Sequence, residues 1–216
     1  MTDLPAPRVR QDRQIRRARL IDDSIQLIGR YGYHGFTVQA LATQSGLTNA
    51  GVLHHFGSKD QLLLAVLDEI ERRESDSIAL VLVAATPETA AGLGPTVVGG
   101  DFAALTVFRA IIQRVVENAA QARFLAALQA ESIDSQHPAH HWFAQREAET
   151  LGLFTRLAWP LHGEDAAAMA RHLTALMYGY VLQWLRSDQG FDLVADFERA
   201  AHTALRPLLD AMARTA

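Results

Sequence analysis

Residues 36–63 read FTVQALATQSGLTNAGVLHHFGSKDQLL, and this stretch decides the fold. Thr37 and Thr48 each stand directly before a short apolar-periodic segment, where a threonine hydroxyl can cap a helix N-terminus. Gly46 lies between the two segments, in a turn that requires positive φ. Two short helices joined by a turn containing glycine are typical of a helix-turn-helix unit. The pattern therefore predicts such a unit at about residues 37–56.

The segments on either side predict longer helices. Ser58 and Gln61 match a capping box that opens a long helix from Asp60. Before the unit, apolar residues recur at helical spacing from about Gln11 to Arg30. Further helices are expected at 101–133, 141–158, 165–187 and 192–213, with a break at 86–100 and a kink or restart at Pro207. The chain is therefore predicted to be all-α, with about nine helices.

Cysteine content and hydropathy exclude several classes of protein. The 216 residues contain no cysteine, which excludes disulfide scaffolds, thiolate metal sites and cysteine nucleophiles. We see no secretory signal in the first thirty residues and no run of eighteen apolar residues, so we expect no membrane segment.

Charge is divided unevenly along the chain. The formal net charge is −4, but residues 1–60 carry eight basic and five acidic side chains, a net of +3. The remaining 156 residues carry a net of −7. Because phosphate contact is local, this asymmetry favours a nucleic-acid partner at the N-terminal end, whereas the overall charge argues against one. The alternative is that the arginines between residues 8 and 19 only form a solvated tail and helix face.

The second short helix has the composition of a helix that reads a DNA groove. Val52, Leu53 and Phe56 can lock it onto the preceding helix. Short polar side chains are left to face outward, and Lys59 follows at a helix N-terminus, which favours a phosphate. The residues predicted to face outward are Thr48, Asn49, Gly51, His54 and His55.

From about residue 14 to residue 74 the sequence resembles the TetR family of transcriptional regulators. The resemblance rests on Phe36-Thr37-Val38, on the Ser45-Gly46-Leu47-Thr48 turn, on His55-Phe56 and on Ser58-Lys59-Asp60, in that order. It implies a basic arm at 1–13, a DNA-binding domain at 14–74, and a helical ligand-binding and dimerisation domain at 75–216. It also implies a homodimeric repressor that leaves a palindromic double-stranded DNA operator when a small, largely apolar effector binds, with the cytoplasm as its location.

The resemblance also assigns roles within the DNA-binding domain. Thr37, His55 and Lys59 would contact the DNA backbone, and Thr48, Asn49, Ala50 and Gly51 would lie nearest the base edges. Arg10 and Arg13 belong to the arm, which can enter a minor groove. His54 is either a DNA contact or an exposed spacer. This chain has Leu53 where many family members have tyrosine, and Asn49 where many have a basic residue.

The C-terminal part suggests an interface and a pocket. Two broadly apolar helices predict a four-helix dimer interface, formed by Leu173, Met177, Tyr180, Trp184, Phe197, Ala201 and Leu205. Aromatic residues are candidates for lining an effector pocket, with plain core as the alternative; they are Phe102, Phe108, Phe124, Trp142, Phe143, Trp159 and Tyr178.

The C-terminal part contains no catalytic motif, so we expect no enzyme and no cofactor. The alternative function is a helical metal-binding protein or metalloenzyme that uses His137, His140 and His141. An interhelix loop that binds no metal explains the same histidines. An activator and a ligand-independent regulator also remain open.

Overall fold

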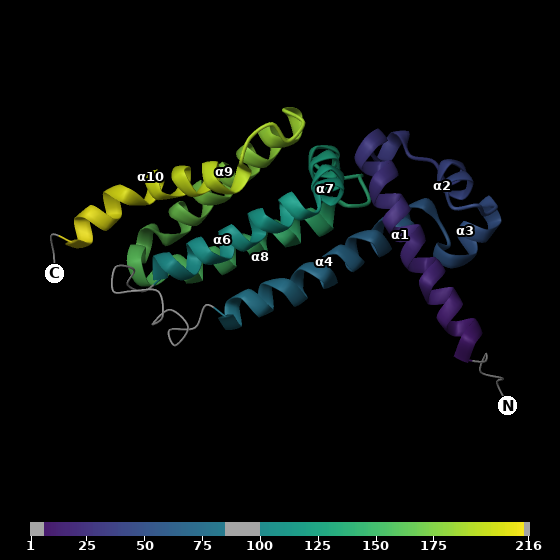
Figure 1. Ribbon diagram of the computed structural model, residues 1–216, viewed down its shortest axis with the longest axis horizontal. Helices are drawn as coiled ribbons and strands as arrows, with labels where there is room; N and C mark the ends of the chain where they lie inside the picture. Colours follow the sequence, from purple (N-terminus) through teal and green to yellow (C-terminus); the bar gives the residue numbers. More distant parts are fainter. Residues whose placement is uncertain (1–6, 85–99, 214–216) are drawn as a thin grey trace. The chain divides into compact units, whose positions relative to one another are not determined.

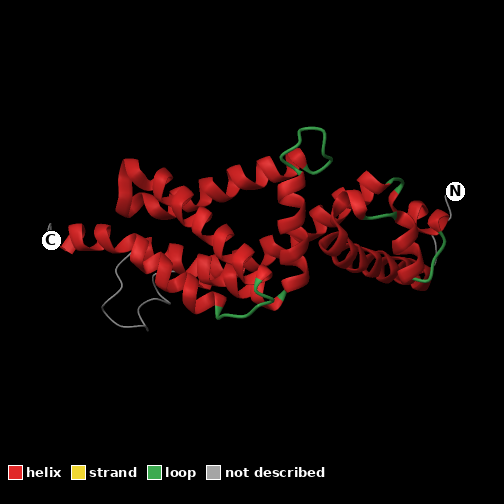
Figure 2. Ribbon diagram, turned by 90° about the horizontal axis from the view of Figure 1, so that it is seen from above, coloured by secondary structure: helices red, strands yellow, loops and turns green. Residues whose placement is uncertain are grey.

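The computed structural model describes the backbone of residues 7–84 and 100–213, and the side chains of residues 13–75, 107–156 and 163–204. These residues form nine α-helices, a single 3-10 turn and no strand, which confirms the all-α prediction (Figures 1 and 2). The helices are α1 (Pro7–Gly35), α2 (Val38–Gln44), α3 (Asn49–Phe56), α4 (Lys59–Ala84), α6 (Gly100–Glu117), α7 (Ala119–Glu131), α8 (His140–His162), α9 (Ala166–Arg186) and α10 (Leu193–Ala213).

Several predictions fall outside the described part of the chain. The expected break at 86–100 lies almost entirely there, and so do the side chains of Arg10, Phe102, Trp159 and Leu205.

The helices form two compact units. The first combines Met1–Arg73 with Ala120–Phe143, and the second combines Glu74–Ala119 with Ala144–Ala216. The first unit therefore contains the helix-turn-helix and also α7, a helix from the middle of the sequence.

The core of the first unit forms where apolar faces of α1, α2, α3, α4 and α7 meet. The predicted stripe of α1 is buried at Ile21, Ile25 and Ile28, but Ala18 is exposed and Leu20 takes its place in the core. All four residues predicted for the buried side of α4 are fully buried: Leu63, Val66, Leu67 and Ile70.

Arg73 of α4 ties this helix to α1. Its guanidinium lies 3.0 Å from Asp22 of α1 and 2.8 Å from Glu69, one turn earlier on α4. Hydrogen bonds from Arg72 and Arg73 lower the pKa of Glu69 to about 2, against the opposing effect of partial burial. These ion pairs help to fix the orientation of α4 against α1, while the burial of apolar side chains stabilises the contact between the two helices.

Two helix boundaries differ from the prediction. First, α1 begins at Pro7, so that residues 7–13 of the expected arm form its first turns, and it is interrupted at Gly32, where φ is 71°. Second, the helix predicted at 101–133 is broken at Asn118 into α6 and α7. The Asn118 backbone N–H and side-chain amide both donate to the Arg114 carbonyl, at 2.9 and 3.3 Å. An asparagine that competes for backbone groups in this way favours a helix end.

The second unit is built on α6, the later part of α8, α9 and α10. Phe108 stacks on Phe154 with ring centroids 4.0 Å apart, and Phe197 packs against Phe108 at 5.7 Å. The backbone of α10 stays helical through Pro207, so the restart predicted there is wrong, although proline removes one helical hydrogen bond. Among the helices described, none combines the length and the apolar character needed to cross a bilayer.

Candidate nucleic-acid interface

The two short helices are held at their N-termini by the predicted caps. The Thr37 hydroxyl accepts a hydrogen bond from the Ala40 N–H, and the Thr48 hydroxyl accepts one from the Gly51 N–H, both at 3.1 Å. Gly46 adopts a φ of +66°, which lets the Leu47 N–H bond to the Ala42 carbonyl at 2.8 Å. The turn and both caps are therefore confirmed, and they fix the angle between α2 and α3.

One face of α3 is buried and the other is open to solvent. Val52 and Phe56 lie in the core at 0% and 7% exposure. Leu53, predicted to share this role, is 37% exposed, so that prediction is wrong: it lies one residue beyond Val52, and the helical turn carries it to the open side. The open side also presents Thr48, Asn49, Ala50 and His54.

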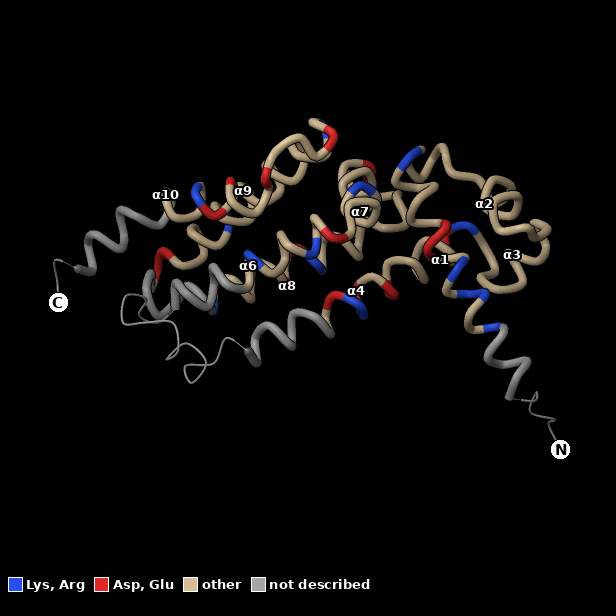
Figure 3. Tube along the Cα trace, in the orientation of Figure 1, with Lys and Arg blue, Asp and Glu red and all other residues tan. Residues whose placement is uncertain are grey.

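The charge of this unit comes from α1 and not from the short helices. No charged residue occurs between Tyr31 and Ser58, and α2 and α3 carry neither blue nor red in Figure 3. The exposed arginines of α1 supply the positive charge; those described are Arg13, Arg16, Arg17 and Arg19. The face thus combines the uncharged helix α3 with the basic helix α1.

His55 of α3 is within the electrostatic influence of the arginines of α1. Partial burial lowers its pKa, and the charges of Arg13, His54, Arg16 and Arg17 lower it further, in that order. The guanidinium of Arg17 also lies 5.0 Å from the centre of the Phe56 ring, a cation–π contact that holds α1 against the end of α3. The lowered pKa of His55 favours the neutral ring, whereas a phosphate at this position would favour the charged form.

Lys59 is anchored at the start of α4. Its Nζ lies 4.3 Å from the centre of the Tyr33 ring and 5.7 Å from that of Phe36. Partial burial lowers the pKa of Lys59, and the charges of Asp60 and Glu131 oppose this shift. The Tyr33 hydroxyl donates to Asp60, and burial together with this bond raises the pKa of Tyr33. The ammonium group is thus held in place beside the first turn of α4.

Glu131 is a residue that the sequence did not reveal as part of this unit. It is the last residue of α7, and its carboxylate oxygens accept from the Tyr33 N–H at 3.2 and 3.0 Å. Tyr33 and Glu131 are 98 positions apart, so no local pattern could have paired them.

The predicted histidine cluster is wrong in its composition. The His140 ring bonds to the Ser132 carbonyl at 2.8 Å, and His141 is exposed, so neither joins His137. Across the described residues, the only group of three ligand-type side chains that comes close together is His34, Glu131 and His137. His137 lies in the turns at 132–139, whereas His140 and His141 begin α8, and the tertiary fold brings His34 to His137.

The aromatic residues proposed for an effector pocket are divided between the two units. Phe124, Trp142 and Phe143 pack in the first unit, where the Trp142 indole N–H donates to Glu71 at 3.2 Å. Phe108 is fully buried in the second unit, and burial raises the pKa of half-buried Tyr178 there. Each of these described candidates therefore packs in or against the apolar core of its own unit.

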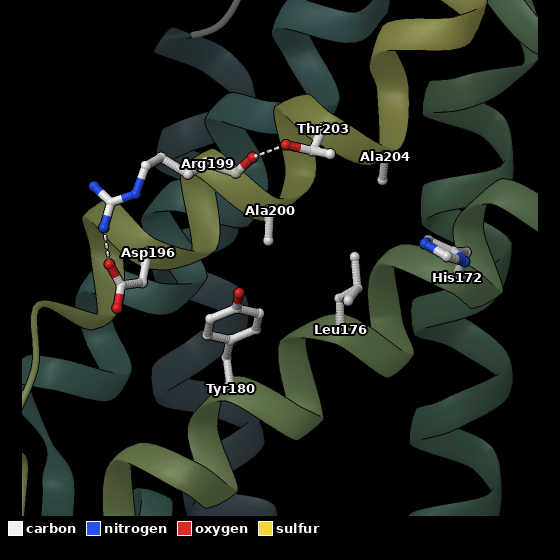
Figure 4. Close-up of a pocket in the computed structure, with 8 residues that line it drawn as sticks. All are labelled: His172, Leu176, Tyr180, Asp196, Arg199, Ala200, Thr203 and Ala204. Carbon is white, nitrogen blue, oxygen red and sulfur yellow. Dashed lines mark hydrogen bonds and ion pairs between the residues drawn. The ribbon is translucent and has the colours of Figure 1, made fainter.

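The residues proposed for dimerisation are mostly buried within the chain itself. Tyr180 is half-buried, whereas the other described members have 6% exposure or less; they are Leu173, Met177, Trp184, Phe197 and Ala201. The outer side of the same two helices forms a groove of about 550 Å³. Figure 4 shows its lining, with His172, Leu176 and Tyr180 on α9 and Asp196, Arg199, Ala200, Thr203 and Ala204 on α10.

Comparison with known sequences identifies the N-terminal part of the chain. Residues 20–66 match the family model of bacterial regulatory proteins of the tetR family. The HTH-type transcriptional regulator BetI of Rhizobium meliloti is 35% identical over 74 residues, which are 34% of this chain and 36% of BetI. BetI of Escherichia coli is 31% identical over 88 residues, 41% of this chain and 45% of BetI. The matches thus span less than half of the curated relatives.

Solved structures share the fold over most of the chain. A TetR-family transcriptional regulator from Streptomyces coelicolor has a TM-score of 0.67 at 23% identity, covering 89% of this chain and 95% of that one. The regulator FadR from Bacillus subtilis, solved in complex with stearoyl-CoA, has a TM-score of 0.66 at 16% identity, covering 88% and 96%. The N-terminal domain of this chain is therefore a tetR-family regulatory domain, carried by a chain with the fold of TetR-family regulators.

Proposed function

We propose that the protein is a sequence-specific DNA-binding regulator of transcription, and that it represses by occupying an operator. The observation that carries the proposal is the α2–α3 unit: two capped helices with a buried apolar side and an open, uncharged polar side, within the stretch that matches the tetR family. Such a helix can enter a major groove without charge repulsion, although Leu53 leaves one apolar side chain on its open side. The exposed arginines of α1 support phosphate contact beside it.

Individual roles follow from position and exposure. Thr48, Asn49 and Ala50 are exposed at the start of α3, the end that reaches base edges in helix-turn-helix proteins. Gly51 and His54 continue this surface. Backbone contacts to phosphate are proposed for Thr37, His55, Lys59, Arg10 and Arg13.

We further propose that the reading domain covers residues 14–74, and that the remaining helices bind an effector and dimerise. A homodimer would match a palindromic operator, because two-fold symmetry in the protein requires it in the DNA. Support for a largely apolar effector comes from FadR of Bacillus subtilis, which has this fold and was solved with stearoyl-CoA. A regulator of transcription works where the chromosome is, so we expect a cytoplasmic protein, and we expect no enzymatic activity.

The test is selection of bound duplexes from a random DNA library by the full chain, followed by anisotropy titrations of the enriched sequence and a scrambled one. A specific regulator should prefer the enriched sequence by about a thousandfold or more. Affinity should fall steeply between about 50 and 200 mM salt. A library that yields no enriched sequence would contradict the proposal.

A further inference from the structure

Three side chains from separate segments of the first unit converge at one point. His34 lies in the last turn of α1, Glu131 ends α7, and His137 lies in the turns between α7 and α8. One nitrogen or oxygen ligand atom from each lies within 4.8 Å of the other two. His137 Nε2 is 3.6 Å from Glu131 Oε2, close to the separation of about 3.4 Å between two ligands of a tetrahedral zinc ion.

The nitrogen that points into this cluster has no hydrogen-bond partner. The His137 side chain is 1% exposed, and its Nε2 is the one buried side-chain polar atom without such a bond in the described residues. Its other nitrogen, Nδ1, accepts from the Ala139 N–H at 3.1 Å. A buried polar atom without a hydrogen bond is costly and rare in native proteins, which favours a bound ligand at this position.

The carboxylate is positioned as a metal ligand requires. Both Glu131 oxygens accept from the Tyr33 N–H, which orients the group as an outer-shell donor does in metal sites. A side chain at position 32 would place its Cβ 2.2 Å from Glu131 Oε1, and Gly32 also has a φ of +71°. A carboxylate has about four lone-pair positions, so these contacts leave room for a cation.

The electrostatics select a cation over an anion. Glu131 and Asp134 are the negative groups that act on the His137 ring, and His34 is the other basic group that does so. His34 is exposed, so one ligand of this cluster is open to solvent.

We propose that His34, Glu131 and His137 bind a divalent transition-metal ion of the zinc type, with water in the fourth position. Two imidazole nitrogens with one carboxylate oxygen suit zinc, whereas magnesium and calcium prefer sites formed by oxygen alone. The ion would join the end of α1 directly to the turns that precede α8.

Binding requires a proton to move within His137. Because Nδ1 accepts from Ala139, the neutral ring carries its proton on Nε2 in the metal-free protein. The ion needs the Nε2 lone pair, so the ring proton passes to Nδ1 and the hydrogen bond from the Ala139 N–H is given up. Losing that bond weakens binding by about ten- to a hundredfold relative to a site with Nδ1 already protonated. The site is therefore suited to reversible binding, and the Ala139 amide reports on it.

The first experiment measures zinc binding to untagged full-length protein by calorimetry, with zinc chloride as the probe. His34→Ala removes one ligand from an exposed position, and His141→Ala is the matched control, because His141 is an exposed histidine outside the cluster. We expect one ion per chain for the wild type and for His141→Ala, and affinity at least about tenfold weaker for His34→Ala. At equal zinc concentration, the melting temperature should rise more for the first two proteins than for the third.

The second experiment follows the Ala139 backbone amide of the wild type by NMR during the same zinc titration. Because it uses the wild type alone, its result does not depend on whether a variant folds. A shift of this resonance that saturates at one equivalent supports the proposal. The proposal is overturned if zinc does not bind at up to about 100 µM, or if the Ala139 amide does not respond. It is also overturned if His34→Ala binds as well as His141→Ala, because the histidines would then act only as surface ligands.

Discussion

Asn49 is the first residue of α3, and it is exposed beside the threonine that caps the helix. An asparagine amide can pair bidentately with adenine, whereas an arginine contacting phosphate carries no sequence information. We expect Asn49→Ala to weaken binding to the selected operator by about 1–3 kcal/mol and to relax its preference at one base pair.

Arg13→Gln is the comparison variant for Asn49→Ala. It should weaken binding to specific and scrambled duplexes alike and reduce the salt slope by about one. Anisotropy titrations on operators with single base changes distinguish the two variants. Equal losses on every sequence for Asn49→Ala would remove it from base reading.

We expect DNA binding to depend on pH through His55. Its pKa is lowered in the free protein, first by burial and then by the charges of the α1 arginines and His54, so the neutral ring is favoured. A nearby phosphate favours the charged ring, so the complex takes up a proton and affinity should rise as pH falls from 8 to 6, by at most about tenfold per pH unit. His55→Gln should flatten this dependence, and His202→Gln, an exposed histidine of the second unit, should not.

The same shift of the His55 pKa has an opposite effect on stability. The unfolded chain binds the proton more readily than the folded one, so the free energy of unfolding falls as pH drops from about 6.5 toward the folded pKa. Titrations should therefore be paired with circular dichroism at each pH. A pH dependence unchanged by His55→Gln would assign it to another group.

At the scale of elements, α7 belongs to the first unit because α1 allows it to approach closely. A Cβ on Gly29 would lie 3.1 Å from the Phe124 backbone nitrogen and 3.3 Å from its Cα, both rigid atoms of the neighbouring helix. Phe124 and Leu128, on this helix, are fully buried in the core of the first unit. The α1–α7 contact is thus as much a part of the first unit as the helix-turn-helix.

Gly29→Ala should therefore destabilise the protein although alanine favours helix. We expect a loss of about 1–3 kcal/mol in the free energy of unfolding, because α7 must move away from α1. Gly152→Ala on α8 is the matched control, because its Cβ would meet only the end of the Arg156 side chain, at 3.4 Å. The higher helix propensity of alanine should then raise the free energy of unfolding by about 0.5–1 kcal/mol. Urea unfolding measures the free energy of unfolding of both variants. A Gly29→Ala variant more stable than the wild type would contradict the close contact.

At the scale of the whole molecule, we expect the proposed dimer to form at the groove lined by α9 and α10. Ala200 and Ala204 line this groove with small side chains that allow a partner helix to come close. We expect Ala200→Glu to convert the dimer into monomers, because the partner would bury the new carboxylate while Arg199, the arginine of the groove, is already paired with Asp196. Light scattering with size-exclusion chromatography measures this, with Ala168→Glu, exposed on the first turns of α9 and outside the groove, as the control. A dimer that survives Ala200→Glu would place the interface elsewhere.

The sequence by itself determined the local structure of this protein. Thr37, Gly46 and Thr48 act on neighbours within a few residues, through caps and a turn, so their roles could be read from spacing alone. The stripes of α1 and α4 were predicted nearly correctly because helical periodicity is a local property. The family resemblance and the N-terminal position of the positive charge needed no coordinates either.

Only the tertiary structure decided which distant segments meet. It placed α7 against Gly29 and paired Glu131 with Tyr33. It also brought His34, and not His140 or His141, next to His137. Most of the residues predicted for dimerisation are buried within the chain. Such contacts depend on how helices far apart in the sequence pack. A hydrophobic pattern shows that a face is buried, but not whether its own chain or a partner covers it.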